Sequence, residues 1–374
     1  MNFETLPFWV YIVGFLLMLG PLVVLHELGH YLVGRWFGVG AEAFSVGFGK
    51  EIAGYTDKRG TRWKLSALPI GGYVQFQGDM NPASQPDPDH PASEGDFQNA
   101  PLWQRALIVA AGPVANVIVA VGIFTAFFMI FGQPVAGDPV QENVIVEFAD
   151  DSPAREAGIQ VGDRIIAVEG EEMDSFREVQ QAIWLYPNEE LDVTVEREGS
   201  RITIPVTTRS EEITDQFGNA SVIGLIGVQG PAIERVFEPV GPFAALGLAW
   251  QQCVETVDMM LVGIKQIIVG DRSVEELGGP ITIAKVSGEQ LSLGWLEFTS
   301  FAALISLNLA FINLLPIPAL DGGHLAFYAV EAIRRKPASP RSQELAFRTG
   351  MALVLALMLF VTVIDIAKLP IFGS

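Results

Sequence analysis

The chain has 374 residues, half of them hydrophobic, and its positive mean hydropathy of +0.36 indicates a membrane protein. The formal net charge of −20 must then be concentrated outside the membrane, and residues 134–297 hold 29 acidic against 10 basic side chains, a balance of −19. This acidity excludes nucleic acid as a partner, and the single cysteine, Cys253, excludes an intrachain disulfide.

The first apolar segment, residues 1–35, combines a predicted membrane span with a metal-binding pattern. Residues 8–25 carry no charge, and His26-Glu27-x-x-His30 follows in the same predicted helix. Residues four apart share one helix face, so both histidines can face one zinc ion while Glu27 reaches the attacking water as a general base. The alternative is a pair of histidines that only pack, and a third ligand decides between the two.

Residues 36–103 are predicted to be a cytoplasmic loop with two strands, at 44–49 and 65–77, because they lack a helical period and are rich in strand formers. Residues 81–98, rich in Pro, Asp, Ser and Gly, form a polar insert in this loop. A second span follows at residues 104–132.

A soluble domain is predicted at residues 141–230. The order Ser-Pro-Ala, Ala-Gly and Gly-Asp-x-Ile between Ser152 and Ile165 resembles a PDZ domain. Such domains bind peptides by adding a strand to a sheet edge. Two roles remain open here: a reader of peptide termini, and a steric gate that excludes bulky ectodomains.

The rest of the chain is predicted to hold two further spans. Residues 238–298 are interpreted as an amphipathic segment at the membrane surface, with a true span across 241–270 as the alternative. Residues 299–324 form the third span and its Leu-Asp-Gly-Gly-His loop, and residues 347–366 form the fourth. Asp321 in that loop is the candidate third zinc ligand at membrane depth.

Basic residues predict the orientation, because they are retained on the cytoplasmic side of a membrane. They crowd the loops that follow the first and third spans. Both chain ends and the PDZ-like domain should therefore lie in the periplasm, with the active site toward the cytoplasmic side of a bacterial inner membrane.

The two metal motifs together carry a family resemblance. His26-Glu27-Leu28-Gly29-His30 and Asn313-x-x-Pro316-x-Pro318-x-Leu320-Asp321-Gly322-Gly323 resemble the site-2 protease family of intramembrane zinc metalloproteases, in its bacterial regulator-of-sigma-E branch. Gly112-Pro113-x-x-Asn116 resembles another element of that family. The resemblance implies that His26, His30 and Asp321 bind Zn²⁺, that Glu27 is the catalytic base and that Asn313 lies near the substrate carbonyl. It also implies a membrane-dipping β element whose edge, Tyr73, Val74, Gln75 and Phe76, binds substrate.

The expected fold is a polytopic α-helical membrane protein with about four transmembrane helices, a membrane-associated β loop and an inserted α+β PDZ-like domain. The expected partners are membrane lipid and transmembrane protein substrates, such as anti-sigma-factor-like regulators or remnant signal peptides, with a peptide or a substrate ectodomain at the PDZ-like domain. A metal transporter and a catalytically silent PDZ scaffold are the alternatives. A transporter has no need of Glu27 beside the first histidine, and a silent scaffold should have lost part of the metal set.

Overall fold

The computed structural model describes residues 6–79, 93, 95–135, 143–173, 175–214, 220–230, 236–269, 278–336 and 339–367. The chain divides into two compact units. Met1–Ile130 together with Gly241–Ser374 form one, called here the membrane unit, and Phe131–Val240 form the other, called the inserted unit.

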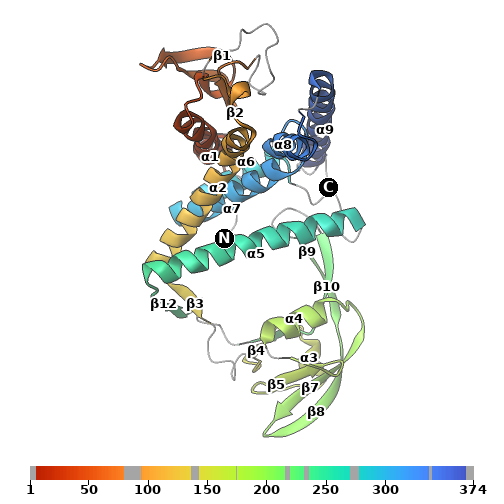
Figure 1. Ribbon diagram of the computed structural model, residues 1–374. Helices are drawn as coiled ribbons and strands as arrows, with labels where there is room; N and C mark the ends of the chain where they lie inside the picture. Colours follow the sequence, from red (N-terminus) through yellow and green to blue (C-terminus); the bar gives the residue numbers. More distant parts are fainter. Residues whose placement is uncertain are drawn as a thin grey trace. The chain divides into compact units, whose positions relative to one another are not determined.

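Among the described residues, four helices of the membrane unit are long and apolar enough to cross a membrane, by length and composition (Figure 1). They are α1 (Phe8–Trp36), α2 (Leu102–Phe131), α7 (Trp295–Leu314) and α9 (Pro340–Ala367). The expectation of about four transmembrane helices is therefore confirmed. The last helix begins earlier than the predicted residue 347.

The region predicted as one surface segment, 238–298, contains two separate helices, α5 (Pro242–Val269) and α6 (Pro280–Leu293), and the start of α7. Helix α6 packs closely on α1, where a Cβ on Gly14 would lie 2.8 Å from the backbone nitrogen of Gly288. Two glycines facing each other let the helix backbones approach closely. The pattern of apolar residues along one segment gives no sign of its contact with a distant helix, so α6 was not predicted as a separate element.

The β loop is more extensive than its two predicted strands. Strand β1 (Ala41–Thr56) pairs antiparallel with β2 (Arg62–Phe76) along a curved ladder. Phe44 pairs with Val74 on one side and with Trp63 on the other, so the last part of β2 is one outer edge of the sheet and the end of β1 is the opposite edge. The 3₁₀ helix η1 (Phe97–Asn99) follows. Of the predicted polar insert, residues 81–92 and 94 lie outside the described residues.

Aromatic side chains join this sheet to α1. Tyr31 contacts the rings of both Phe44 and Trp63, and Phe76 stacks on Phe97. Apart from Trp63, these rings are almost fully buried. This core holds the outer edge of β2 beside the histidine-bearing part of α1.

The inserted unit is an α+β domain, as expected. Its main sheet has the order β6-β5-β7-β8 and is packed around a core of aliphatic side chains. Ser152 and Ser175 cap its two helices by accepting hydrogen bonds from backbone amides. Its elements are β3 (Gln133–Val135), β4 (Glu147–Phe148), α3 (Pro153–Glu156), β5 (Arg164–Val168), β6 (Glu171–Glu172), α4 (Phe176–Trp184), β7 (Glu190–Arg197), β8 (Ser200–Thr207), β9 (Arg209–Thr214), β10 (Ala220–Leu225), β11 (Val228–Gln229) and β12 (Val236–Glu238).

Candidate active site

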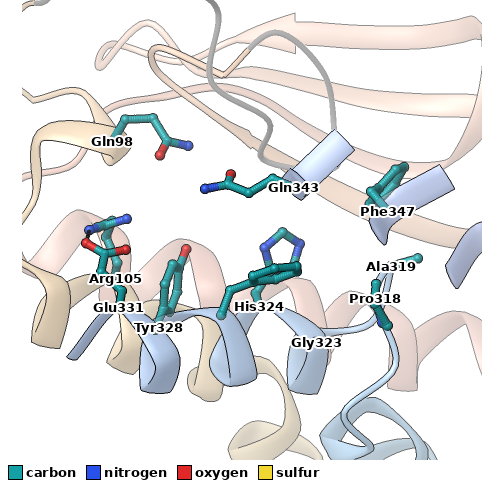
Figure 2. A pocket seen from close by; sticks show the side chains of 11 residues that line it. Gln98, Arg105, Pro318, Ala319, Gly323, His324, Tyr328, Glu331, Gln343 and Phe347 are labelled. Atoms are coloured by element: carbon teal, nitrogen blue, oxygen red, sulfur yellow. Dashed lines mark hydrogen bonds and ion pairs between the residues drawn. The ribbon is translucent and has the colours of Figure 1, made fainter. Parts of the chain in front are cut away.

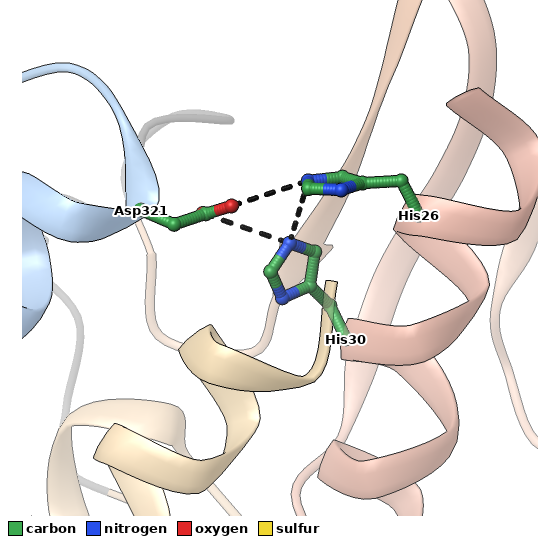
Figure 3. Close-up of side chains that lie close together, drawn as sticks. All are labelled: His26, His30 and Asp321. Atoms are coloured by element: carbon green, nitrogen blue, oxygen red, sulfur yellow. Dashed lines mark hydrogen bonds and ion pairs between the residues drawn. The ribbon is translucent and has the colours of Figure 1, made fainter. Parts of the chain in front are cut away.

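Three side chains from two distant parts of the membrane unit converge on one point (Figure 3). His26 and His30 lie one turn apart on α1, and Asp321 is the first residue of α8 (Asp321–Arg334). The Nε2 atom of His26 lies 3.2 Å from that of His30 and 3.2 Å from Oδ2 of Asp321, and Nε2 of His30 lies 3.6 Å from Oδ1 of Asp321. Both histidines are buried.

These donor atoms fit a zinc ion in their chemistry and in their spacing. Two imidazoles and one carboxylate form a ligand set of catalytic zinc sites, which keep a fourth position open. Tetrahedral ligands at about 2.0–2.1 Å from zinc are roughly 3.3 Å from one another, close to the separations seen here.

Space for the ion is left by a glycine of α2. A Cβ built on Gly112 would lie 2.2 Å from Nε2 of His30 and 2.8 Å from Nε2 of His26. Any side chain at Gly112 would therefore fill the space that the two ring nitrogens face. The residues present fit the metal.

The loop between α7 and α8 places Asp321. Leu315 is extended after α7, and Ala319 has φ of +95°, a conformation that costs free energy for any residue with a Cβ. Asp321 was predicted in a loop, but it is the first residue of helix α8. Gly322 and Gly323 are helical and buried, and a Cβ on either would lie within 2.4 Å of a backbone carbonyl oxygen, so they allow close packing of α8.

A cavity of about 580 Å³ surrounds the side chains of His26, His30 and Asp321. Of the predicted substrate residues, Asn313, Tyr73, Val74 and Phe76 line this cavity together with Glu27. Gln75 is not among its lining residues, and its side-chain amide donates to the Glu42 carboxylate and to the Asp79 carbonyl. Within a strand, neighbouring side chains point to opposite faces, which separates Gln75 from Val74.

The predicted base and the predicted edge strand lie side by side. Glu27 and Val74 line the same cavity. A Cβ on Gly72 would lie 3.2 Å from Cγ of Glu27 and 2.8 Å from the Ser45 carbonyl oxygen. Gly72 thus allows the edge of β2 to lie against the base.

A second, smaller cavity of about 50 Å³ adjoins the site on the side of α8 (Figure 2). Arg105 forms an ion pair with Glu331 at 2.8 Å and lies 5.0 Å from the ring centre of Tyr328. Burial raises the pKa of Tyr328, so its phenol is protonated at neutral pH. Ala319, His324 and Phe347 line both cavities. No local sequence pattern predicts this polar cavity, because its residues come from separate segments of the chain.

Comparison with known proteins identifies the family. The model of peptidase family M50 matches residues 14–357, which include both metal motifs. The chain belongs to this family, the site-2 protease family. It is accordingly a zinc metalloprotease.

Relatives match over nearly the full length of this M50 peptidase. It is 43% identical to an Agrobacterium fabrum protein and 44% identical to a Rhizobium meliloti protein, both provisionally named zinc metalloproteases, over 96% and 94% of the chain and 96% and 95% of theirs. It is 33% identical to metalloprotease MmpA of Caulobacter vibrioides, over 98% of the chain and 97% of that protein. Among solved structures, a Listeria monocytogenes PDZ domain covers 24% of the chain and 88% of its own length, at 16% identity and a TM-score of 0.20.

Proposed function

We propose that this M50 peptidase cleaves single-span membrane proteins within the membrane. The observation that carries the proposal is the lining of the large cavity. All four apolar helices contribute to it, with Glu27 from α1, Val109 from α2, Asn313 from α7 and Met351 from α9. A peptide bond that reaches the metal ligands is therefore surrounded by helices suited to a membrane.

The residues divide the chemistry among them. His26, His30 and Asp321 would hold the zinc, which when bound polarises the scissile carbonyl and makes water a better nucleophile. Glu27 takes a proton from the attacking water and returns it to the leaving amine, as the water oxygen bonds to the carbonyl carbon and the C–N bond breaks. Asn313 donates a hydrogen bond to the carbonyl oxygen as negative charge develops there.

The edge of β2 gives the substrate backbone a partner. A transmembrane helix satisfies its carbonyl and amide groups internally, so a bond becomes accessible only after local unwinding. The edge formed by Tyr73, Val74 and Phe76 lines the cavity and supplies backbone groups to an extended segment. Strand addition at this edge places the unwound segment beside Glu27.

The expected substrates are anti-sigma-factor-like regulators trimmed outside the membrane, or remnant signal peptides, in a bacterial inner membrane. Basic residues after α1 and near the end of α8 favour a cytoplasmic position for both loops, with the inserted unit in the periplasm. There the inserted unit acts as a PDZ-like gate or a peptide reader. Removing the inserted unit distinguishes the two roles. The loss of a gate would change which ectodomain sizes are cleaved, whereas the loss of a peptide reader would not.

Reconstitution tests the proposal. The purified full-length chain is placed in liposomes with a single-span substrate, and the cleaved bond is mapped by mass spectrometry. We expect cleavage inside the apolar segment and none with Glu27→Gln. Cleavage confined to the substrate's soluble parts would contradict the intramembrane assignment. Zinc flux across the liposome membrane without cleavage would instead favour the transporter alternative.

A further inference from the structure

Asn116 of α2 lies beside the metal ligands and has no part in the chemistry proposed above. Its side chain is fully buried, and its Nδ2 lies 3.2 Å from Nδ1 of His26. Its Oδ1 is also buried and has no hydrogen-bond partner among the described residues. The backbone at this position is held separately, because the Ser306 hydroxyl of α7 donates to the Asn116 carbonyl at 2.8 Å.

The metal-binding role of His26 determines what its Nδ1 requires. A neutral imidazole that offers the Nε2 lone pair to a metal carries its hydrogen on Nδ1, so Nδ1 is a donor and needs an acceptor. The second ligand meets this requirement, since Nδ1 of His30 lies 2.8 Å from the carbonyl oxygen of Ile108, also on α2. An amide nitrogen facing Nδ1 of His26 would place a donor against a donor.

Rotation of the Asn116 carboxamide by 180° removes the conflict between the two donors. The amide group is planar, and its oxygen and nitrogen ends have nearly the same shape, so the rotation needs no other movement. It brings Oδ1, which has no partner in the other orientation, to the position facing Nδ1 of His26. An acceptor then faces the Nδ1 hydrogen, so this orientation is favoured when His26 binds a metal through Nε2.

We propose that Asn116 is a positioning residue whose Oδ1 accepts the Nδ1 hydrogen of His26 and so directs Nε2 toward the metal. Helix α2 then supplies the outer partner of both histidines, through the backbone at Ile108 and through a side chain at Asn116. The inference rests on the zinc site alone and is independent of where the substrate is cleaved.

Zinc affinity of the purified full-length chain tests the proposal, measured by competition with a chelator. Outer partners of ligating histidines typically change metal affinity by 10–100-fold, so we expect Asn116→Leu to weaken zinc binding by about that factor. Asn116→Asp offers only oxygen acceptors and should bind zinc at least as tightly as the wild type. Thr125→Val removes a polar group from the same helix, where the hydroxyl donates to the Val121 carbonyl, and should leave the affinity unchanged.

The aspartate variant decides the test even if the leucine variant does not fold. An asparagine that acts by donating through Nδ2 is not replaced by aspartate, so zinc binding by Asn116→Asp as weak as that of a His26→Ala control would overturn the proposal. Wild-type affinity in a folded Asn116→Leu variant would overturn it as well.

Discussion

At the scale of single residues, the metal site depends on a missing side chain as much as on its ligands. Gly112 lies so close to His26 and His30 that a methyl group there would meet both ring nitrogens. A side chain at position 112 would therefore occupy the space in front of the ring nitrogens that a bound metal needs. The close approach of α2 to α1 is tolerated only with glycine at this position.

Gly112→Ala is the corresponding prediction. The added methyl group should displace the zinc, so that zinc content falls from about one per chain to a small fraction and cleavage is lost. Gly122→Ala is the matched control, because it makes the same change on α2, where the added Cβ would meet no atom of another described element within 4 Å. Atomic absorption on the purified variants measures the zinc. Equal zinc content in both variants would show that Gly112 does not border the metal.

The sequence predicts some of these residues and misses others for a physical reason. His26, Glu27 and His30 lie within one helix, so their spacing and the helical period are enough to predict that they lie close together. Asp321 is far along the chain, and only its position among apolar residues and a family resemblance indicated it. The roles of Gly112 and Asn116 depend on how closely α2 approaches α1, and no local pattern encodes that distance.

Among the elements, the edge of β2 lies beside Glu27, the proposed catalytic base. Tyr73, Val74 and Phe76 line the cavity together with Glu27, so this edge is available to pair with a substrate strand. The two strands were predicted from composition, but their curved pairing was not. It depends on β1 pairing on both sides, a long-range property of the folded chain.

Val74→Pro tests the pairing of this edge with a substrate. Proline removes the Val74 amide without touching the proposed metal ligands, so a short, already extended peptide should still be cleaved at close to the wild-type rate. A helical transmembrane substrate must also gain backbone bonds during unwinding, and one lost bond of about 1 kcal/mol corresponds to about a fivefold larger reduction. The kcat/KM ratio between a helical substrate and a short extended peptide measures this difference. An unchanged ratio with normal zinc content would exclude strand pairing at Val74.

In the inserted unit, an ion pair between Asp163 and Arg197 fastens the turn before β5 to β7. The side chain of Asp163 is 2% exposed and receives two hydrogen bonds from the guanidinium group, at 2.7 and 2.6 Å. Hydrogen bonding to Arg197 lowers the pKa of Asp163 below its usual range. The pair therefore stabilises the unit fully at pH values above about 3.9, the pKa of an aspartate in the unfolded chain. This contribution is lost as the pH falls through the lower pKa that Asp163 has in the folded protein.

Asp163→Asn should destabilise the inserted unit by about 2 kcal/mol at neutral pH, with the difference from the wild type shrinking below about pH 4. Hydrogen exchange of the β7 amides, measured on both full-length proteins at each pH, gives the difference directly. A difference that stayed constant down to pH 2 would mean that the Asp163 charge contributes nothing.

At the scale of the whole molecule, the four apolar helices follow from composition, and their number agrees with the prediction. Helix α5 is the ambiguous element, because a crossing there would reverse everything after it. The structure brings Asp321, after α7, to the histidines of α1. This arrangement is compatible with α1 and α7 crossing the membrane in the same direction. That direction requires that, of the helices between them, only α2 crosses the membrane.

Reporter fusions test this topology. A reporter after Arg197 should register outside the cytoplasm, and one after Pro337 should register inside it, because we propose that α5 lies along the membrane surface and does not cross it. Alkaline phosphatase and green fluorescent protein fusions in intact bacteria give opposite signals for the two sides. Should both fusions register on the same side, α5 crosses the membrane and the proposed orientation fails.

We propose that His26, His30 and Asp321 hold a zinc ion that works with Glu27 to hydrolyse a peptide bond. Zinc content and substrate cleavage, measured on the same purified samples, test this assignment. Glu27→Gln should retain about one zinc per chain and cleave nothing, while His26→Ala should lose both. Zinc content equal to the wild type in a double variant, His26→Ala with Asp321→Ala, or cleavage by Glu27→Gln, would contradict the assignment.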